Sequence, residues 1–266
     1  MRIAYTNLID SSTITASTAI TNYPFTNVQN QRLASTYRTS TLSAIEIVVA
    51  LPSYVSEITT FAIMGHNLTS AAIISVSLNT LENITYNDDM ILKFFQFEAG
   101  TIITEAGDSL LIEDGNNIIT EASTLPSYAY IHISDASNPD GYIEIGRLWL
   151  GSYITIDPSS LEDFRVIKKR SDIVTHGKNR NKYGSIGTGW RRFELSFPQT
   201  QEATISLINT MYDSVGNHSS FIFCNFDVIR DYVLVEPCYV SIDGEVTFNH
   251  KTRMKFEYAL NMEEEL

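Results

Sequence analysis

The sequence predicts a mainly β protein with two domains, and its composition, its residue pattern and its length lead to that prediction. Apolar residues make up 44% of the chain and charged residues 18%, so a core can form and the charge content is too low for a disordered chain. Short β-branched and aromatic runs recur between Pro, Gly, Asn and Ser, which is typical of strands and turns. Helical periodicity is clear only at about 201–215. A length of 266 residues suits two domains.

The first domain is predicted to span residues 1–152 and to be a β-sandwich. Residues 45–51 form a β-branched run that ends at Pro52, and residues 58–64 form a second apolar run that ends at Gly65. Residues 128–134 alternate between polar and apolar side chains, and 142–150 form a last apolar run. Short strands that alternate in this way are typical of a sandwich with loops gathered at its ends.

Five residues in or beside these loops are the candidate sandwich-loop site. His66 follows Met64-Gly65 directly, so we expect it to be fixed in a turn and not to act in catalysis. The candidate residues are Tyr23, Tyr37, Arg38, His66 and Asn67.

Residues 101–122 contain an internal repeat with glutamates at 105, 113 and 121. The spacing is even, so in a strand the repeated residues would share one face. Gly-Asp and Gly-Asn pairs supply turns, and we predict a small hairpin insertion in the sandwich. The repeat lacks the dense ligand spacing of a calcium loop, so a solvated acidic edge is the preferred interpretation and a cation site the alternative.

The second domain is predicted to span residues 153–266, after a linker near 152–162. A strand is expected at 191–197 and is expected to end at Pro198, and a helix at 201–215 has apolar residues on one face. Glu263-Glu264-Glu265 is expected to be a frayed tail. Further strands are expected at 221–226, 232–236, 239–242 and 255–260.

Basic residues are concentrated between Arg165 and Arg192. This stretch contains nine Lys or Arg residues and one acidic residue, Asp172. Within this stretch, 176–189 has no apolar period and is predicted to be a long exposed loop. A solvated basic face, a contact with an acidic neighbour such as another copy of the chain, and a nucleic-acid site all remain open. The overall net charge of −13 argues against nucleic acid as a partner. The candidate subunit-contact residues are Lys178, Arg180, Lys182, Arg191 and Arg192.

No motif for catalysis or for cofactor binding is present in the sequence. There is no phosphate-binding loop and no nucleophile elbow, and the glycines at 184, 187 and 189 do not have dinucleotide-binding spacing. We therefore expect no catalytic residues, no cofactor and no metal. The two cysteines, Cys224 and Cys238, are expected to be buried free thiols. No segment is apolar enough to predict a membrane span or an export signal, so synthesis in a cytoplasm is expected.

Several short segments resemble the discoidin-like, galactose-binding sandwich found in tail proteins of long-tailed bacteriophages. These are Tyr23-Pro24-x-x-Asn27-Val28, Tyr37-Arg38-Thr39-Ser40, the strand 45–51, 63–68 and Gly141-Tyr142-Ile143-Glu144-Ile145-Gly146-Arg147-Leu148-Trp149-Leu150-Gly151. The order of elements after residue 153 is similar to the tail-tube fold of tube and distal tail proteins.

The resemblance implies a structural component of a phage tail tip or baseplate, located in the virion. The second domain would form a ring with other copies, a hexamer being one option, and would contact tube, hub or fibre proteins. The sandwich would face outward for fibre attachment or contact with the host surface. Two other hypotheses stay open: a carbohydrate-binding module that recognises host-surface glycans, and a glycosidase or depolymerase.

Overall fold

The computed structural model divides the chain into two compact units. Unit 1 consists of Met1–Tyr5 and most of the chain from Ile154 onward, and unit 2 of Thr6–Tyr153. The sequence prediction places Met1–Tyr5 in the N-terminal domain, 1–152. The structure instead groups them with the C-terminal part of the chain, in unit 1. The residues described are 1–42, 44–53, 58, 60–79, 92–93, 101–103, 127–156, 163–176, 182–185, 187–200, 202–227, 232–244, 246–252 and 255–265.

Unit 1 is built on an eight-stranded antiparallel sheet, in the order β12-β1-β17-β18-β20-β16-β13 with β19 paired to β20. The N-terminal strand β1 joins this sheet because Arg2 pairs with both Thr155 and Cys224. The strands are β1 (Arg2–Ala4), β12 (Ile154–Thr155), β13 (Asp163–Arg170), β16 (Gly189–Thr200), β17 (Phe221–Asp227), β18 (Tyr232–Ile242), β19 (Thr247–Thr252) and β20 (Lys255–Glu264).

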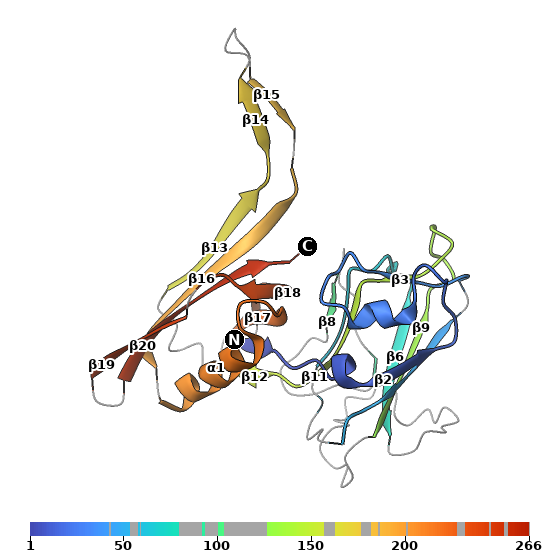
Figure 1. The fold of residues 1–266 in the computed structure, drawn as a ribbon, viewed down its shortest axis with the longest axis horizontal. Helices are drawn as coiled ribbons and strands as arrows, with labels where there is room; N and C mark the ends of the chain where they lie inside the picture. The colour runs from blue at the N-terminus through green and yellow to red at the C-terminus, as the bar shows by residue number, and fades with distance from the viewer. Residues whose placement is uncertain are drawn as a thin grey trace. The chain divides into compact units, whose positions relative to one another are not determined.

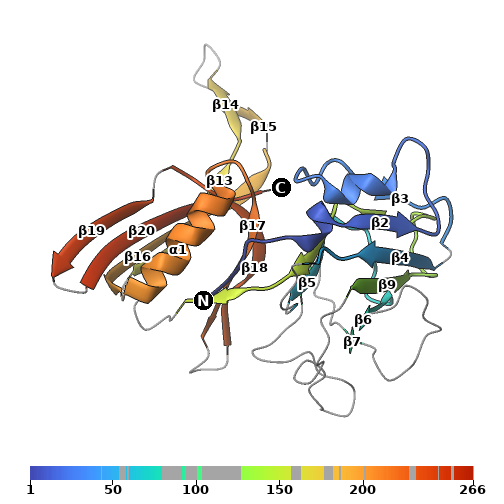
Figure 2. The ribbon, with the colours of Figure 1, turned by 60° about the horizontal axis from the view of Figure 1, so that its bottom comes forward.

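One helix, α1 (Glu202–Val215), packs against this sheet (Figures 1 and 2). Its buried side chains recur at helical spacing, and Gly216 ends it in the left-handed conformation. Alternate residues of β16 face the core because side chains alternate along a strand. Aromatic rings fill much of that core, with Phe197 stacked on Tyr258 at 4.2 Å and Phe193 at 5.5 Å from Phe223.

Strands β13 and β16 form a long ribbon that continues into a second hairpin, β14 (Ile173–His176) and β15 (Lys182–Ser185). Figure 1 shows this hairpin projecting from the sheet of unit 1. β13 is the last strand of the sheet, so one of its edges has no neighbouring strand among the described residues. Its side chains Val166 and Ile167 are 43% and 38% exposed, on opposite faces of the ribbon.

Three features of unit 1 differ from the sequence prediction. The predicted loop 176–189 contains strand β15, because its backbone pairs with β14 even though its side chains lack an apolar period. Pro198 does not end β16, since a register shift between Phe197 and Thr200 accommodates it. Two of the three residues of the expected frayed tail, Glu263 and Glu264, belong to β20 and pair with β16 or β18.

Unit 2 is a β-sandwich of short antiparallel sheets and two 3₁₀ turns, η1 (Leu8–Ser11) and η2 (Phe25–Gln29). A five-stranded sheet has the order β2-β4-β9-β6-β7, a three-stranded sheet the order β11-β5-β8, and β3 pairs with β10. The strands are β2 (Thr13–Ala16), β3 (Tyr37–Arg38), β4 (Ile45–Ala50), β5 (Thr60–Met64), β6 (Ile73–Asn79), β7 (Leu92–Lys93), β8 (Thr101–Ile103), β9 (Tyr128–Ser134), β10 (Glu144–Ile145) and β11 (Arg147–Gly151).

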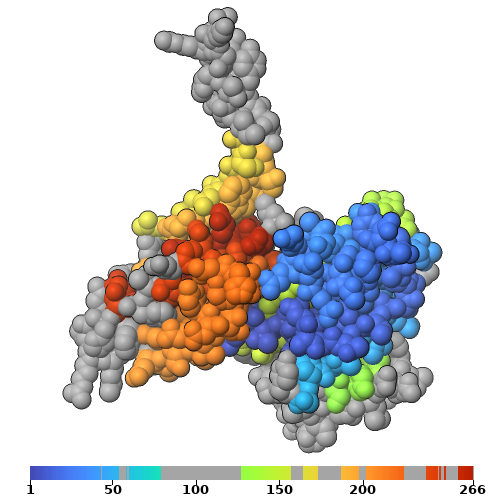
Figure 3. All heavy atoms as spheres, viewed as in Figure 1, coloured from blue at the N-terminus to red at the C-terminus, as the bar shows by residue number. Residues whose placement is uncertain are grey.

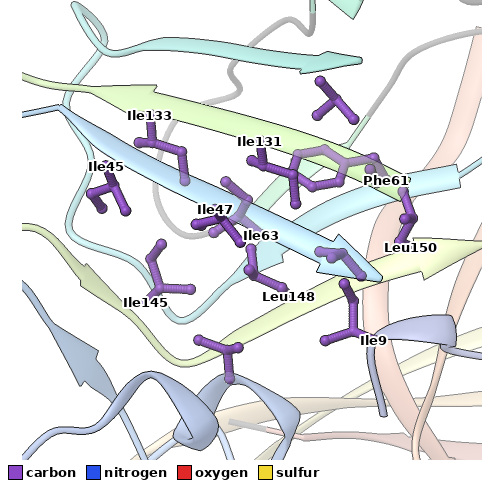
Figure 4. Packing of buried hydrophobic residues seen from close by; sticks show 14 of the residues in the cluster. Ile9, Ile45, Ile47, Phe61, Ile63, Ile131, Ile133, Ile145, Leu148 and Leu150 are labelled. Carbon is purple, nitrogen blue, oxygen red and sulfur yellow. The ribbon is translucent and has the colours of Figure 1, made fainter. Parts of the chain in front are cut away.

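The core of unit 2 lies between its two larger sheets. β4 and β9 contribute alternate residues, whereas β5 and β11 are buried along their whole length. Figure 4 shows the isoleucines of β4 and β9 packed against Phe61, Ile63, Leu148 and Leu150. β-branched residues suit this arrangement because their stiff side chains pack well on a pleated surface.

The prediction of a mainly β protein with a single packed α-helix is confirmed for the part of the chain that the structure describes. α1 begins at Glu202 and ends at Val215, close to the predicted bounds. Of the acidic repeat, only β8 is described, and it pairs with β5. The glutamates at 105, 113 and 121 lie outside the described residues, so the predicted hairpin insertion there stays a prediction.

Candidate functional site

Four side chains from three separate segments meet at the loop end of unit 2. Tyr23 precedes η2, and Arg38 is in β3. Tyr142 lies just before β10, and Glu144 is its first residue. The antiparallel pairing of β3 with β10 places Arg38 directly opposite Glu144. We call these four residues the tyrosine–arginine cluster.

The backbone of the first segment holds Tyr23 beside Arg38. The Arg38 amide donates to the Tyr23 carbonyl at 3.4 Å, and the Tyr23 amide donates to the Ile20 carbonyl at 2.9 Å. The Ile20 amide in turn donates to the Arg38 carbonyl at 3.2 Å. This closed set of bonds fixes the turn that carries the tyrosine. In Figure 3, the blue surface of unit 2 is formed by the N-terminal part of the chain, to which this turn belongs.

The guanidinium of Arg38 lies against both tyrosine rings and one carboxylate. Its Cζ is 4.2 Å from the centroid of the Tyr23 ring and 4.9 Å from that of Tyr142, which are cation–π distances. Its Nε is 2.7 Å from Oε2 of Glu144, with the side chains of Arg38 and Glu144 29% and 19% exposed. Loss of hydration lowers the pKa of Arg38, but the hydrogen bond and the charge of Glu144 outweigh this and raise it. The guanidinium is therefore a fixed, partly exposed cation.

Asn67 fixes the segment that carries Tyr142 and Glu144. Its Oδ1 accepts from the Glu144 amide at 2.7 Å, and its Nδ2 donates to the Tyr142 carbonyl at 3.0 Å and to Asp140 at 2.9 Å. These bonds satisfy the side chain of Asn67 with protein groups, so it supports the cluster from behind. Asn67 is thus a positioning residue, not a free loop amide.

A buried aspartate, Asp135, anchors the loop that precedes the cluster. It is 1% exposed, and its carboxylate accepts from the Thr69 amide at 2.7 Å and from the Thr69 hydroxyl at 2.8 Å. Asn138 also donates to it, at 3.3 Å, and to the Asn67 carbonyl at 2.9 Å. The 135–142 loop is therefore tied to the 67–69 turn by side-chain hydrogen bonds.

Two of the five predicted sandwich-loop residues have internal roles. Tyr37 is fully buried, packs edge-on against Phe25 at 4.9 Å and donates its hydroxyl to the Thr18 carbonyl at 2.5 Å. His66 accepts at Nδ1 from the Leu68 amide at 3.1 Å, and burial lowers its pKa to about 4. His66 is therefore neutral at pH 7 and closes the turn at Gly65, whose φ is +61°. The structure brings Tyr23 and Arg38 together in the cluster, with Asn67 behind them.

Sequence reasoning missed Tyr142 and Glu144 as site residues and treated them only as part of a strand. Their place in the cluster depends on a pairing between residues more than one hundred positions apart, Arg38 and Glu144. A half-buried tyrosine and glutamate that alternate with buried Ile143 and Ile145 are a weak signal that could have identified them.

Two of the predicted subunit-contact residues, Arg191 and Arg192, form ion pairs within unit 1. Arg191 donates to both carboxylate oxygens of Glu264, at 3.0 and 2.6 Å, and Arg192 is 2.9 Å from Asp243. Both arginines thus have acidic partners within their own unit, which the frayed-tail prediction did not foresee. Lys182 lies in β15, whereas Lys178 and Arg180 lie outside the described residues.

Glu263 forms the second ion pair at this end of β20. It accepts from the indole of Trp190 and from Lys169 at 3.0 Å, and these two hydrogen bonds lower its pKa. The acidic end of β20 therefore pairs with basic residues of both β13 and β16, through Lys169 and Arg191.

A further charged pair of unit 2 joins a buried arginine to a partly exposed aspartate. Arg147 is 1% exposed, and its guanidinium is 2.6 Å from Asp10 and donates to the Gln29 carbonyl at 3.1 Å. Burial raises the pKa of Asp10, although the charge of Arg147 opposes this. The pair joins η1 and η2 to β11 and is structural.

No group of three or more metal-ligating side chains is found among the described residues. In the same part of the chain, no helix is long and apolar enough to cross a membrane.

Comparison with protein-family models gave no match, and comparison with curated proteins gave none either. Among solved structures, a chitosan-binding module from Paenibacillus sp. IK-5 is 12% identical, covers 55% of this chain and 99% of its own, and has a TM-score of 0.37. A carbohydrate-binding module from Clostridium perfringens, in complex with galactose, is 15% identical, covers 58% and 100%, and has a TM-score of 0.32.

A fucolectin from Morone saxatilis is 9% identical, covers 98% of this chain and 92% of its own, and has a TM-score of 0.34. Identities and TM-scores are low for all three structures.

Proposed function

We propose that this chain is a non-catalytic binding protein whose unit 2 recognises carbohydrate at the tyrosine–arginine cluster. The observation that supports this is the meeting of two tyrosines, a fixed guanidinium and a carboxylate at the loop end of the sandwich. The proposal concerns binding alone.

The chemistry of the cluster matches the surface of a pyranose. A sugar ring has C–H groups on its faces, which pack on aromatic rings, and hydroxyls at its edge, which both donate and accept hydrogen bonds. The tyrosine rings offer apolar area, Arg38 offers donors and Glu144 offers acceptor oxygens. Charge-assisted hydrogen bonds of this kind are stronger than neutral ones.

The cluster is also held in place before a ligand arrives. The Ile20–Tyr23–Arg38 backbone bonds fix one side, and Asn67 fixes the other. A rigid site loses little conformational entropy on binding, so a modest number of contacts gives measurable affinity.

The cluster has the wrong composition for glycoside hydrolysis. That reaction uses two carboxyl groups that flank the scissile bond, whereas the cluster contributes one carboxylate, which is ion-paired to Arg38. We therefore propose binding without cleavage.

Glycan binding is tested on the full chain with an array of bacterial polysaccharides, followed by titration of Arg38→Ala and Tyr142→Ala. Each substitution is expected to reduce affinity by about tenfold or more, in line with the loss of a central interface residue. Arg32→Ala is the matched control, because Arg32 is exposed outside the cluster. Failure of the array, or equal affinity of all variants, would reject the proposal.

A second candidate function is the structural role in a phage tail tip, favoured by the ribbon of unit 1. β13 has an open edge with Val166 and Ile167 exposed, and β14–β15 extend it as a two-stranded hairpin. Such edges pair readily with another chain, and an isolated two-stranded hairpin is marginal in water. We propose that copies associate through this ribbon, with tube, hub or fibre proteins as further partners in a virion.

This second candidate predicts association that weakens when the ribbon is altered. Sedimentation velocity at rising concentration is expected to show a ring or another closed oligomer for the natural chain. Ile167→Lys is expected to shift the population toward monomer, with Leu207→Lys on the exposed face of α1 as the control. A chain that stays monomeric at every concentration, with or without tail proteins, would exclude the role.

A further inference from the structure

We propose that the tyrosine–arginine cluster selects uncharged sugar units and discriminates against sugars that carry a carboxylate. This inference rests on the proposed carbohydrate function and names the chemical class of its ligand. Two features carry it: the ion pair of Arg38 with Glu144, and the negative net charge of unit 2.

The positive charge of Arg38 is already offset within the cluster. Glu144 is 2.7 Å from its Nε, and Asn67 bonds the backbone of Glu144 and holds this carboxylate in place. A sugar carboxylate that approached Arg38 would lie close to the carboxylate of Glu144. Like charges brought together at a partly buried site weaken binding, and here the cation that could compensate is already paired.

The remaining hydrogen-bonding capacity of the cluster suits hydroxyl groups. The ion pair uses Nε of Arg38, and a guanidinium carries further N–H donors on its two Nη atoms. Oε2 of Glu144 lies at the same guanidinium, 2.7 Å from its Nε. A hydroxyl pair can accept from the guanidinium and donate to the carboxylate at the same time, whereas a carboxylate can only accept.

The net charge of unit 2 acts in the same direction. Residues 6–153 contain 15 of the 31 acidic residues but only four of the 18 Lys and Arg residues. Their formal charge of −11 is most of the −13 of the whole chain. A field of this sign lowers the local concentration of anionic ligands and slows their association.

The test is a ligand-observed NMR titration of the full chain with a panel of monosaccharides. The neutral arm uses methyl glucoside, methyl galactoside and N-acetylglucosamine, and the acidic arm uses glucuronate, galacturonate and N-acetylneuraminate. We expect the chain to bind at least one neutral sugar. At low salt, its affinity for that sugar is expected to be about tenfold or more higher than for any acidic sugar.

Glu144→Gln tests the cause of the selectivity. The substitution keeps the shape of the side chain and removes the charge that offsets Arg38, so acidic sugars are expected to gain about tenfold relative to neutral ones. Glu46→Gln is the matched control, since it makes the same change in the charge of unit 2 at an exposed position of β4. It is expected to leave the ratio unchanged.

The outcomes separate this inference from the function on which it rests. Preference for an acidic sugar in the natural chain, abolished by Arg38→Ala, overturns the selectivity and leaves carbohydrate binding standing. A ratio that shifts equally in Glu144→Gln and Glu46→Gln also overturns it, because the cluster would then not be its source. Binding of no sugar from either arm, or from the polysaccharide array, overturns both.

Discussion

At the scale of single residues, His66 couples the fold of unit 2 to pH. In the folded chain, burial lowers its pKa from 6.5 to about 4, so the unfolded chain takes up a proton there at a higher pH. A group with a depressed basic pKa destabilises the fold as it becomes charged, because the unfolded state then binds more protons. The stability that neutral His66 supports is fully present above pH 6.5 and falls as the pH drops toward 4.

We therefore expect the free energy of unfolding of unit 2 to fall by up to about 3 kcal/mol between pH 6.5 and pH 4 through this residue. His66→Gln is expected to flatten the dependence in that window, measured by urea denaturation at a series of pH values. His218→Gln, at an exposed position after α1, is the control and is expected to follow the natural chain. An unchanged pH profile in His66→Gln would contradict the assignment.

The residue scale also shows what the sequence could and could not predict about the candidate site. Tyr23 and Arg38 were selected from their loops, and both lie in the cluster. Tyr37, their neighbour in sequence, is buried because side chains alternate along β3, and one-residue differences of this kind are invisible without the register. Tyr142 and Glu144 reach the cluster only through the pairing of β10 with β3.

At the scale of secondary-structure elements, the acidic end of β20 is a stabilising feature of unit 1. A run of glutamates at the end of a chain usually indicates a solvated tail, and the sequence alone predicted one. In the structure Glu264 pairs with Arg191, 73 residues away, and Glu263 pairs with Lys169 and Trp190. Local charge patterning does not show partners on neighbouring strands that are distant in sequence.

Glu264→Gln is expected to lower the free energy of unfolding of unit 1 by about 1–2 kcal/mol. The change weakens both bonds to the Arg191 guanidinium in a setting where Glu264 is only 16% exposed. Urea denaturation in a Trp149→Phe background, where Trp190 alone reports, measures it, and the effect should shrink at high salt. Glu265→Gln is the control, with a loss below about 0.5 kcal/mol because Glu265 is exposed. Equal losses for the two variants would show that the ion pair contributes nothing.

At the scale of the whole molecule, unit 2 is an insertion between two adjacent strands of unit 1. β1 ends at Ala4 and β12 begins at Ile154, and Ile3 pairs with Ile154 in the same sheet. Both ends of unit 2 are also joined, since Asn7 donates to the Leu148 carbonyl at 2.9 Å and accepts from the Leu150 amide at 3.0 Å. The sequence predicted two blocks in tandem because β1 has three residues and carries no sign of its distant partners.

This topology predicts that residues 6–153 fold without the rest of the chain. Their core cluster is drawn entirely from that range, and their ends are already close together, so excision loses none of the buried apolar contacts of that cluster. The chain has two tryptophans, Trp149 in β11 and Trp190 in β16, so each unit carries its own fluorescent reporter. The excised fragment is expected to unfold cooperatively, with Trp149 as its reporter.

The measurement compares the fragment with the full-length Trp190→Phe variant, in which Trp149 alone reports. Equal urea midpoints, within the error of the two transitions, are expected if unit 2 is an independent folding unit. Trp149→Phe then reports unit 1 through Trp190 and should give a separate transition. A fragment without a cooperative transition, or Trp149 and Trp190 signals that always change together, would show that the two units stabilise one another and that the insertion cannot be treated as a separate domain.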